Sequence, residues 1–191
     1  MKIRISTPFN WGKKFEKGSL NTYYVWGANS YNYKYPKGKK LGYTDRISGE
    51  KKEGSGMAGD ETKKFPGPTK GRAHPNFVGL VTIVKPGDKL EDIYAMNKER
   101  TEFLIKKLKK GFNIEFPLDP DSKGSRGKDL KKYILENHGL GQGVAKKRAV
   151  ESKNPQDLKD WESVQKDILI NIEYLFLSLL DKKRSKKRSK K

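Results

Sequence analysis

The strongest constraint on the fold is a long amphipathic pattern near the end of the chain. Asn154 is a favourable N-cap residue, and Pro155 suits the first position of a helix. Apolar residues then recur at steps of three and four, which predicts a helix over 155–181. These residues are Leu158, Trp161, Val164, Ile168, Leu169, Ile172, Leu175, Phe176, Leu179 and Leu180. About 26 residues make a helix roughly 39 Å long, so one large apolar surface has to be covered.

We expect this helix to be the main core helix of the molecule. Three further apolar residues, Ile170, Tyr174 and Leu177, widen its apolar stripe. The alternative is an interface with a second copy or with a protein partner, because the rest of the chain offers few apolar residues to cover so wide a stripe.

The composition limits how large the core can be. Of the 191 residues, 33% are hydrophobic and 35% are charged, against about 45–50% and about 25% in a typical soluble domain. The length allows one ordinary domain, or one small domain with arms. We predict an α+β fold in five segments: an aromatic and basic β region (1–43), a Gly/Pro-rich loop or linker (44–75), a βααβ segment (76–119), a helical region (120–181) and a disordered basic tail (182–191).

The formal net charge of +20 is concentrated at the two ends. Residues 1–75 carry 16 Lys and Arg against 6 acidic residues, whereas residues 76–181 carry 19 against 17. The last ten residues, KKRSKKRSKK, hold eight basic residues and no acidic one. This distribution is typical of a nearly neutral folded body with extensions that bind a polyanion.

The basic tail is predicted to be disordered when free, because it has no apolar residue to bury. Its concentration of one sign of charge favours an arm for nucleic acid, a membrane surface or another polyanion, and a solubilising tail is the alternative. The candidate binding residues are Lys182, Lys183, Arg184, Lys186, Lys187 and Arg188.

The N-terminal region combines strand-forming residues with aromatic and basic ones. Residues 2–5 and 23–26 read as strands, and Tyr24 and Trp26 are expected in the core. Further along, aromatic residues alternate with polar ones and basic residues follow, a pattern that suits stacking on unpaired bases or on the sugar rings of a glycan. The core of a small sheet is the alternative. The residues concerned are Tyr31, Tyr33, Tyr35, Lys37, Lys39 and Lys40.

The segment 44–75 holds the candidate catalytic residues. Asp45, Glu61 and Lys63 fit the spacing of the acidic residues and lysine in metal-dependent nucleases, although their neighbours are Gly-rich and not apolar. His74, with a nearby Lys or Arg, could act as a general base in metal-independent RNA cleavage. A surface-loop histidine in a long linker is the alternative interpretation.

The middle segment predicts the order strand, helix, helix, strand. The strands are expected at 77–84 and 112–117, and Gly111 breaks the second helix. Residues 84–93, VKPGDKLEDI, and 110–117, KGFNIEFP, resemble the two ends of a LysM module, with Lys89 in place of the usual Thr. The resemblance covers about 38 residues. It implies a small βααβ unit that binds N-acetylglucosamine-containing glycans or serves as a structural part of phage tails and contractile assemblies.

A short helix is predicted over 129–138, and a Gly-rich turn follows it. Residues 138–148, HGLGQGVAKKR, resemble the helix-hairpin-helix motif of proteins that bind DNA without sequence preference. Glycines in such a turn expose backbone N–H groups to a phosphate, which neighbouring cations flank. A helix end followed by a plain loop is the alternative, and His138, in the last helical turn, is placed where a cation is favoured. The candidate residues are Gly139, Gly141, Gly143, Lys146, Lys147 and Arg148.

Several classes of protein are excluded or disfavoured. The chain has no Cys and only two His, so neither a thiolate nor a histidine-rich metal site is expected, and no cofactor is predicted. No apolar run approaches the roughly 20 residues that span a bilayer, and the first residues lack the apolar segment of a secretory signal. We therefore expect an intracellular protein, with export by a non-classical route left open.

The leading hypothesis is a non-enzymatic protein that binds nucleic acid or another polyanion through phosphate contacts, with little sequence specificity. The first alternative is a small nuclease or effector toxin that uses His74, or Asp45 with Glu61 and Lys63. The second is a LysM-like structural or glycan-binding component of a phage-tail or secretion assembly.

Overall fold

The computed structural model describes residues 2–6, 21–29, 43–44, 51–52, 76–84, 88–119, 121–122 and 129–188. Helices and strands are both present, so the α+β prediction is confirmed. The strands are β1 (Ile3–Ser6), β2 (Thr22–Asn29), β3 (Tyr43–Thr44), β4 (Lys51–Lys52), β5 (Asn76–Ile83) and β6 (Asn113–Pro117). The helices are α4 (Leu90–Lys109), α5 (Leu130–Asn137), α6 (Val144–Glu151) and α7 (Pro155–Arg188).

Four strands form one parallel sheet in the order β1-β6-β2-β5, and β3 and β4 form a separate antiparallel pair. Ile3 pairs with Ile114, which in turn pairs with Tyr23. The N-terminal strand β2 thus lies between the two strands of the middle segment. The N-terminal and middle segments therefore share one sheet.

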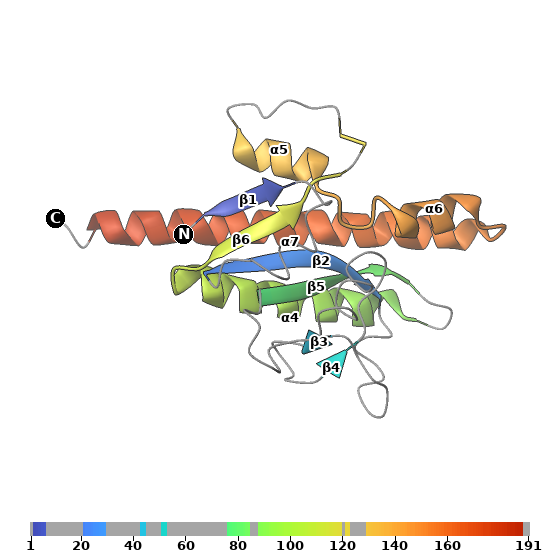
Figure 1. Ribbon diagram of the computed structural model, residues 1–191, viewed down its shortest axis with the longest axis horizontal. Helices are drawn as coiled ribbons and strands as arrows, with labels where there is room; N and C mark the ends of the chain where they lie inside the picture. The colour runs from blue at the N-terminus through green and yellow to red at the C-terminus, as the bar shows by residue number, and fades with distance from the viewer. Residues whose placement is uncertain are drawn as a thin grey trace.

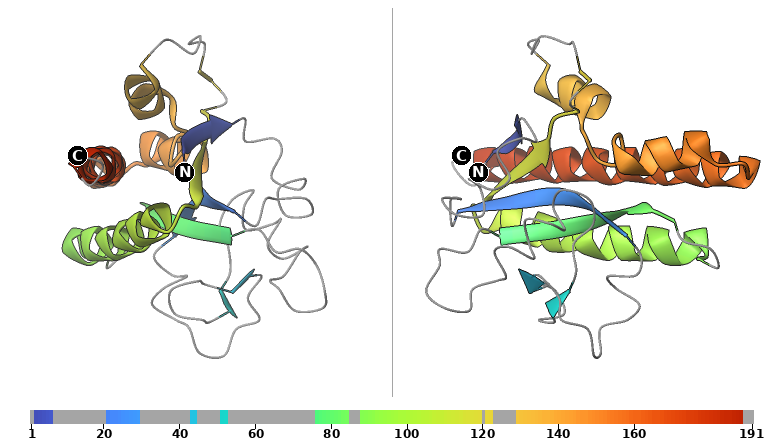
Figure 2. Two further views of the ribbon diagram at one scale, coloured as in Figure 1. Left: turned by 90° about the vertical axis from the view of Figure 1, so that its left-hand side faces the viewer. Right: turned by 45° about the vertical axis from the view of Figure 1, so that its right-hand side comes forward.

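The helices cover one face of this sheet. Figures 1 and 2 show α4 and α7 side by side on the same side of the strands, with α5 and α6 next to α7. Parallel strands require crossover connections, and α4 provides one between β5 and β6. The result is a two-layer arrangement of sheet and helices, with α7 running the whole length of the helical layer.

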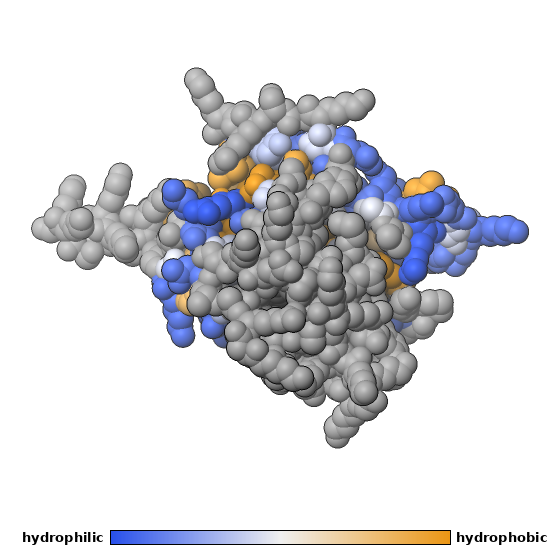
Figure 3. Space-filling view, viewed as in Figure 1, coloured by the Kyte–Doolittle hydropathy of each residue, from blue (hydrophilic) through white to orange (hydrophobic). Residues whose placement is uncertain are grey.

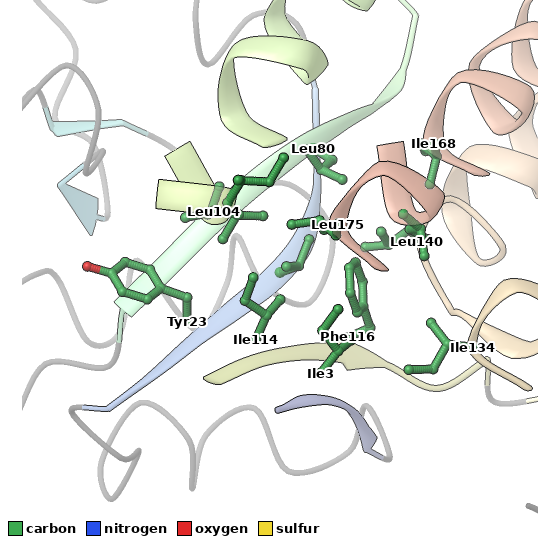
Figure 4. Packing of buried hydrophobic residues seen from close by; sticks show 14 of the residues in the cluster. Ile3, Tyr23, Leu80, Leu104, Ile114, Phe116, Ile134, Leu140, Ile168 and Leu175 are labelled. Carbon is green, nitrogen blue, oxygen red and sulfur yellow. The ribbon is translucent and has the colours of Figure 1, made fainter. Parts of the chain in front are cut away.

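The hydrophobic core lies between these two layers (Figure 4). Period-two alternation turns Tyr23 and Val25 of β2 toward the helices, together with Leu80 of β5 and Phe116 of β6. From α7, inward-facing residues close the core, and all of the following are fully buried: Val164, Ile168, Ile172 and Leu175. The expectation that 155–181 forms the main core helix thus agrees with the packing.

Alternation places Tyr24 and Trp26 on the other face of β2. Both side chains are buried, at 4% and 1% exposed, although neither belongs to the core cluster under the helices. The prediction that these two aromatic residues are core residues is confirmed.

The middle segment differs from the prediction at its centre. One continuous helix, α4, replaces the two helices that the sequence predicted between the strands. Three polar residues, Asn97, Arg100 and Thr101, lie on the buried side of this helix. The inward face is therefore continuous, although its middle has no apolar residues that would show it in the sequence. The helix ends as predicted, because Gly111 has φ 101°, a left-handed conformation that favours glycine.

The last helix is longer than the prediction. Asn154 caps it through its side-chain oxygen, which accepts a hydrogen bond from the N–H of Gln156 at 3.1 Å. The helix continues to Arg188, into the segment 182–191 that the sequence predicts to be disordered. Adding residues to an existing helix costs little free energy compared with starting one. Basic residues are also favoured in the last turns of a helix, because they lie near the negative end of its dipole.

Asn97 joins α4 to both neighbours. Its Oδ1 accepts a hydrogen bond from the N–H of Val81 at 2.7 Å, and its Nδ2 donates to the carbonyl of Val81 at 3.2 Å. The same amide donates to Asp167 Oδ2 of α7 at 2.8 Å. Because β5 is one of the two edge strands of the sheet, Asn97 satisfies backbone groups there that have no further strand to pair with.

Candidate nucleic-acid interface

The turn between α5 and α6 lies against the end of β6. Asp129 caps α5, accepting a hydrogen bond from the N–H of Lys132 at 3.0 Å, and the helix ends at Asn137, one residue before the predicted end. The N–H of Gly139 then donates to the carbonyl of Pro117 at 2.7 Å. A Cβ at position 139 would lie 2.7 Å from the carbonyl oxygen of Leu118. Glycine is needed there because the turn packs directly on backbone.

Gly141 is required for two further reasons. Its φ of 77° is left-handed, and a Cβ at this position would collide with the side-chain amide of Gln165. Its carbonyl accepts a hydrogen bond from Trp161 Nε1 at 3.0 Å. By contrast, Gly143 is exposed at the N-cap of α6, with open space where a Cβ would be. Packing therefore accounts for Gly139 and Gly141, and Gly143 is the candidate glycine that faces solvent.

The three basic residues of α6 are all exposed. Lys146 Nζ lies 5.8 Å from the centroid of the Trp161 ring, and Lys147 Nζ lies 3.9 Å from Glu151 Oε1. An exposed ion pair of this length is worth little, so these cations can bind a phosphate at small cost. Figure 3 shows mostly hydrophilic surface at this end of the molecule, where α6 and the first turns of α7 lie.

Arg148 has different surroundings. It lines a cavity of about 410 Å³ between the end of β5, α6 and the start of α7. Three carboxylates also line this cavity, those of Asp88, Asp157 and Asp160. A phosphate inside would lie close to all three, so the cavity disfavours anions. Of the cationic candidates on α6, Lys146 and Lys147 are therefore the better placed for nucleic acid.

The other basic candidates lie at the far end of α7. The helix runs without a break through residues 182–188, and six of these seven residues are Lys or Arg. Figure 1 shows this end of α7 projecting beyond the sheet, away from α6. The two cationic groups thus stand at opposite ends of one helix.

The remaining candidates lie outside the described residues. They are Tyr31, Tyr33, Tyr35, Lys37, Lys39, Lys40, Asp45, Glu61, Lys63 and His74. Their roles in stacking, in metal-dependent cleavage and in general-base catalysis stay predictions. The nuclease alternative therefore gains no support from the geometry.

His138 is neutral in the fold. Its side chain is 4% exposed, and burial lowers the pKa of the imidazole from 6.5 to about 4, against a smaller opposing effect of the nearby Asp119 carboxylate. The sequence placed a favoured cation at this helix end, and the burial of the ring overrides that effect. His138 therefore contributes no positive charge near pH 7.

Two further observations concern the described part of the chain. Its His, Asp and Glu side chains form no group of three placed to hold a metal ion. None of its helices combines the length and apolar character needed to cross a bilayer.

Comparison with protein-family models, curated proteins and solved structures finds no match to this chain. The fold and the candidate interface therefore define it only as an α+β protein with a parallel sheet, one helical layer and a basic helix end. The LysM-like and helix-hairpin-helix-like resemblances stay predictions.

The sequence does not mark the residues that fix the turn. It predicts Trp161 as part of the apolar stripe and gives no role to Gln165. Both hold the Gly-rich turn, Trp161 by its hydrogen bond to Gly141 and Gln165 through Oε1, which accepts from Gln142 Nε2 at 2.9 Å. A Trp and a Gln one turn apart on the inward side of a helix were the available signal, because their polar atoms need partners when buried.

Proposed function

We propose that the protein binds nucleic acid through backbone phosphate contacts, with low sequence specificity. The observation that carries this proposal is the unbroken course of α7 through residues 182–188. A helix holds its basic residues at fixed spacing, so less conformational freedom is lost on binding than with a disordered arm.

The second contact is assigned to Lys146 and Lys147. These exposed residues lie beside the first turns of α7, next to Trp161. From Trp161, beside Lys146, to residue 185 the helix axis covers about 36 Å. A DNA duplex rises about 3.4 Å per base pair. A duplex therefore has to be about 11 base pairs long to touch both cationic groups.

This geometry gives a test based on length. Fluorescence anisotropy with duplexes of 8, 16 and 24 base pairs should show a large gain in affinity from 8 to 16, and a smaller gain beyond. Salt dependence should be steep, because each neutralised phosphate releases counterions. Equal affinities for the 8- and 16-base-pair duplexes would contradict the two-ended contact.

Two variants separate the ends of the helix. Deletion of residues 182–191 should weaken binding and reduce the slope of log affinity against log salt by several units, since eight cations are removed. Lys146→Ala with Lys147→Ala should abolish the gain between 8 and 16 base pairs. A matched control removes two exposed lysines of α4, Lys98→Ala with Lys106→Ala, and should change little. Binding that is indifferent to the deletion and to salt would overturn the proposal.

A further inference from the structure

The outward side of α7 is apolar in its C-terminal half. Ile170, Tyr174, Leu177 and Leu180 follow one another at steps of four, three and three, and are 65%, 48%, 53% and 51% exposed. Their neighbours on the inward side, Ile168, Ile172 and Leu175, are fully buried. We call these four exposed residues the outer stripe. Scattered exposed apolar residues are ordinary, but four in helical register on one side of one helix form a surface.

Cations lie at both ends of the outer stripe. Lys166 is exposed one turn before Ile170, and the basic segment 182–188 begins two residues after Leu180. Glu173, within the stripe, is paired with Lys131 of α5 at 2.9 Å. Asp167 is turned toward Asn97 and Asn171, whose amides donate to its carboxylate. Asp181 directly follows Leu180, and the six basic residues of 182–188 outnumber it. The surface is therefore apolar in the middle, and basic residues predominate toward its ends.

We propose that the outer stripe and the adjoining basic helix end form a docking surface for anionic lipid membranes. A helix that lies in the membrane interface buries an apolar side and presents basic residues to the headgroups. Clusters of four to eight basic residues on such a helix are typical of binding to anionic lipids. Tyrosine is also enriched at the level of the headgroups, which suits Tyr174.

A second copy of the chain fits this surface less well. A stable interface takes about 20–30 residues from each partner, and the outer stripe offers four. In a parallel pair of these helices the two basic ends would lie together and repel each other. In an antiparallel pair centred on Tyr174, Lys166 of one copy would face Lys182 of the other, and these like charges would also repel.

The proposal is independent of nucleic-acid binding, although both use the basic end of α7. Nucleic acid offers phosphates to the cations and no apolar phase for Ile170 or Leu177. Substitution of the outer stripe therefore separates the two activities: it removes the membrane contact and leaves the phosphate contacts in place.

The test is co-sedimentation of the full chain with vesicles of phosphatidylcholine alone, or with about 30% phosphatidylserine. We expect binding to the anionic vesicles only. The triple variant Ile170→Ser, Tyr174→Ser, Leu177→Ser should bind them at least ten-fold more weakly, and its affinity for a 16-base-pair duplex should stay within two-fold. The matched control, Val150→Ser with Leu158→Ser, removes exposed apolar residues outside the stripe and should bind vesicles as the parent does.

Leu177→Ser alone keeps the test valid if the triple variant does not fold, and should weaken vesicle binding about three-fold. No binding of the parent chain to anionic vesicles, or equal binding of the stripe variants, overturns the proposal. A concentration-dependent dimer that the triple variant abolishes also overturns it, in favour of a second copy. If the parent chain binds anionic vesicles and does not bind the duplex, the proposed function is contradicted and this inference stands.

Discussion

The two sides of α7 contain the same kinds of residue and have opposite surroundings. On the inward side Ile168, Ile172 and Leu175 are fully buried against the sheet and α4. On the outward side Ile170, Tyr174 and Leu177 are about half exposed or more. Similar apolar side chains therefore form the core on one side of the helix and an exposed apolar surface on the other. The free energies of unfolding of variants on the two sides test this distinction.

Ile168→Ala should have the largest effect on stability. The side chain is fully buried between the sheet and the helices, so truncation loses its transfer free energy and leaves a cavity. We expect the free energy of unfolding, measured by urea denaturation, to fall by about 2–5 kcal/mol. A loss below about 1 kcal/mol would show that the inward side of α7 is not tightly packed.

Asn97→Ala tests the polar link across the inward side. The change leaves the N–H and carbonyl of Val81 without their side-chain partner in a buried site, and we expect a loss of about 2–4 kcal/mol. Asn171→Ala is the matched control. It removes bonds only to Asp167, on the same helix, and should cost about 1 kcal/mol. Equal losses in both variants would mean that Asn97 does not join α4 to the sheet edge.

His138 gives the described part of the chain a sensitivity to acid. The folded pKa is about 4 and the unfolded value is 6.5, so between these values the unfolded chain binds a proton that the folded chain does not. Stability is fully present above about pH 6.5 and falls as the pH drops toward 4, by on the order of 3 kcal/mol. The measurement is the difference in unfolding free energy between the parent and His138→Gln across pH 4–7. A constant difference would contradict the burial of a neutral imidazole.

Ile170→Ala should have the smallest effect, although it lies only two residues from Ile168. Its side chain is 65% exposed, and surface substitutions of this kind usually change stability by less than about 0.5 kcal/mol. It serves as the matched partner of Ile168→Ala in the same denaturation experiment. A loss comparable to that of Ile168→Ala would mean that the outward side is covered in solution.

The strands and the cap of α7 could be predicted because their signals are local. Apolar and β-branched runs placed β1, β2, β5 and β6 to within a few residues, and Asn154 with Pro155 marked the start of α7. The order of the sheet could not be predicted, because pairing of β2 with both β5 and β6 depends on packing between distant segments. The sequence predicts two helices in place of α4 because Asn97 and Thr101 are polar residues on its buried side, which hydrophobic periodicity does not register.

The candidate interface was predictable in position and not in detail. The Gly-rich turn and the basic residues of α6 are where the sequence placed them. What Gly139 and Gly141 do depends on Leu118 and Gln165, which are about 20 residues away in the sequence. Likewise, the sequence showed that the stripe of α7 is wide, and only the packing decided which of its residues face outward.

The pairing of Ile3 with Ile114 has a consequence for the newly made chain. The first strand has no place in the sheet until β6 has been synthesised, and the core stays uncovered until most of α7 follows. At about 5–20 residues per second, roughly 10–35 s pass between the synthesis of β1 and that of α7. During that interval the early strands expose apolar surface and unpaired edges. The chain is therefore expected to fold late, and to need protection from aggregation while it is being translated.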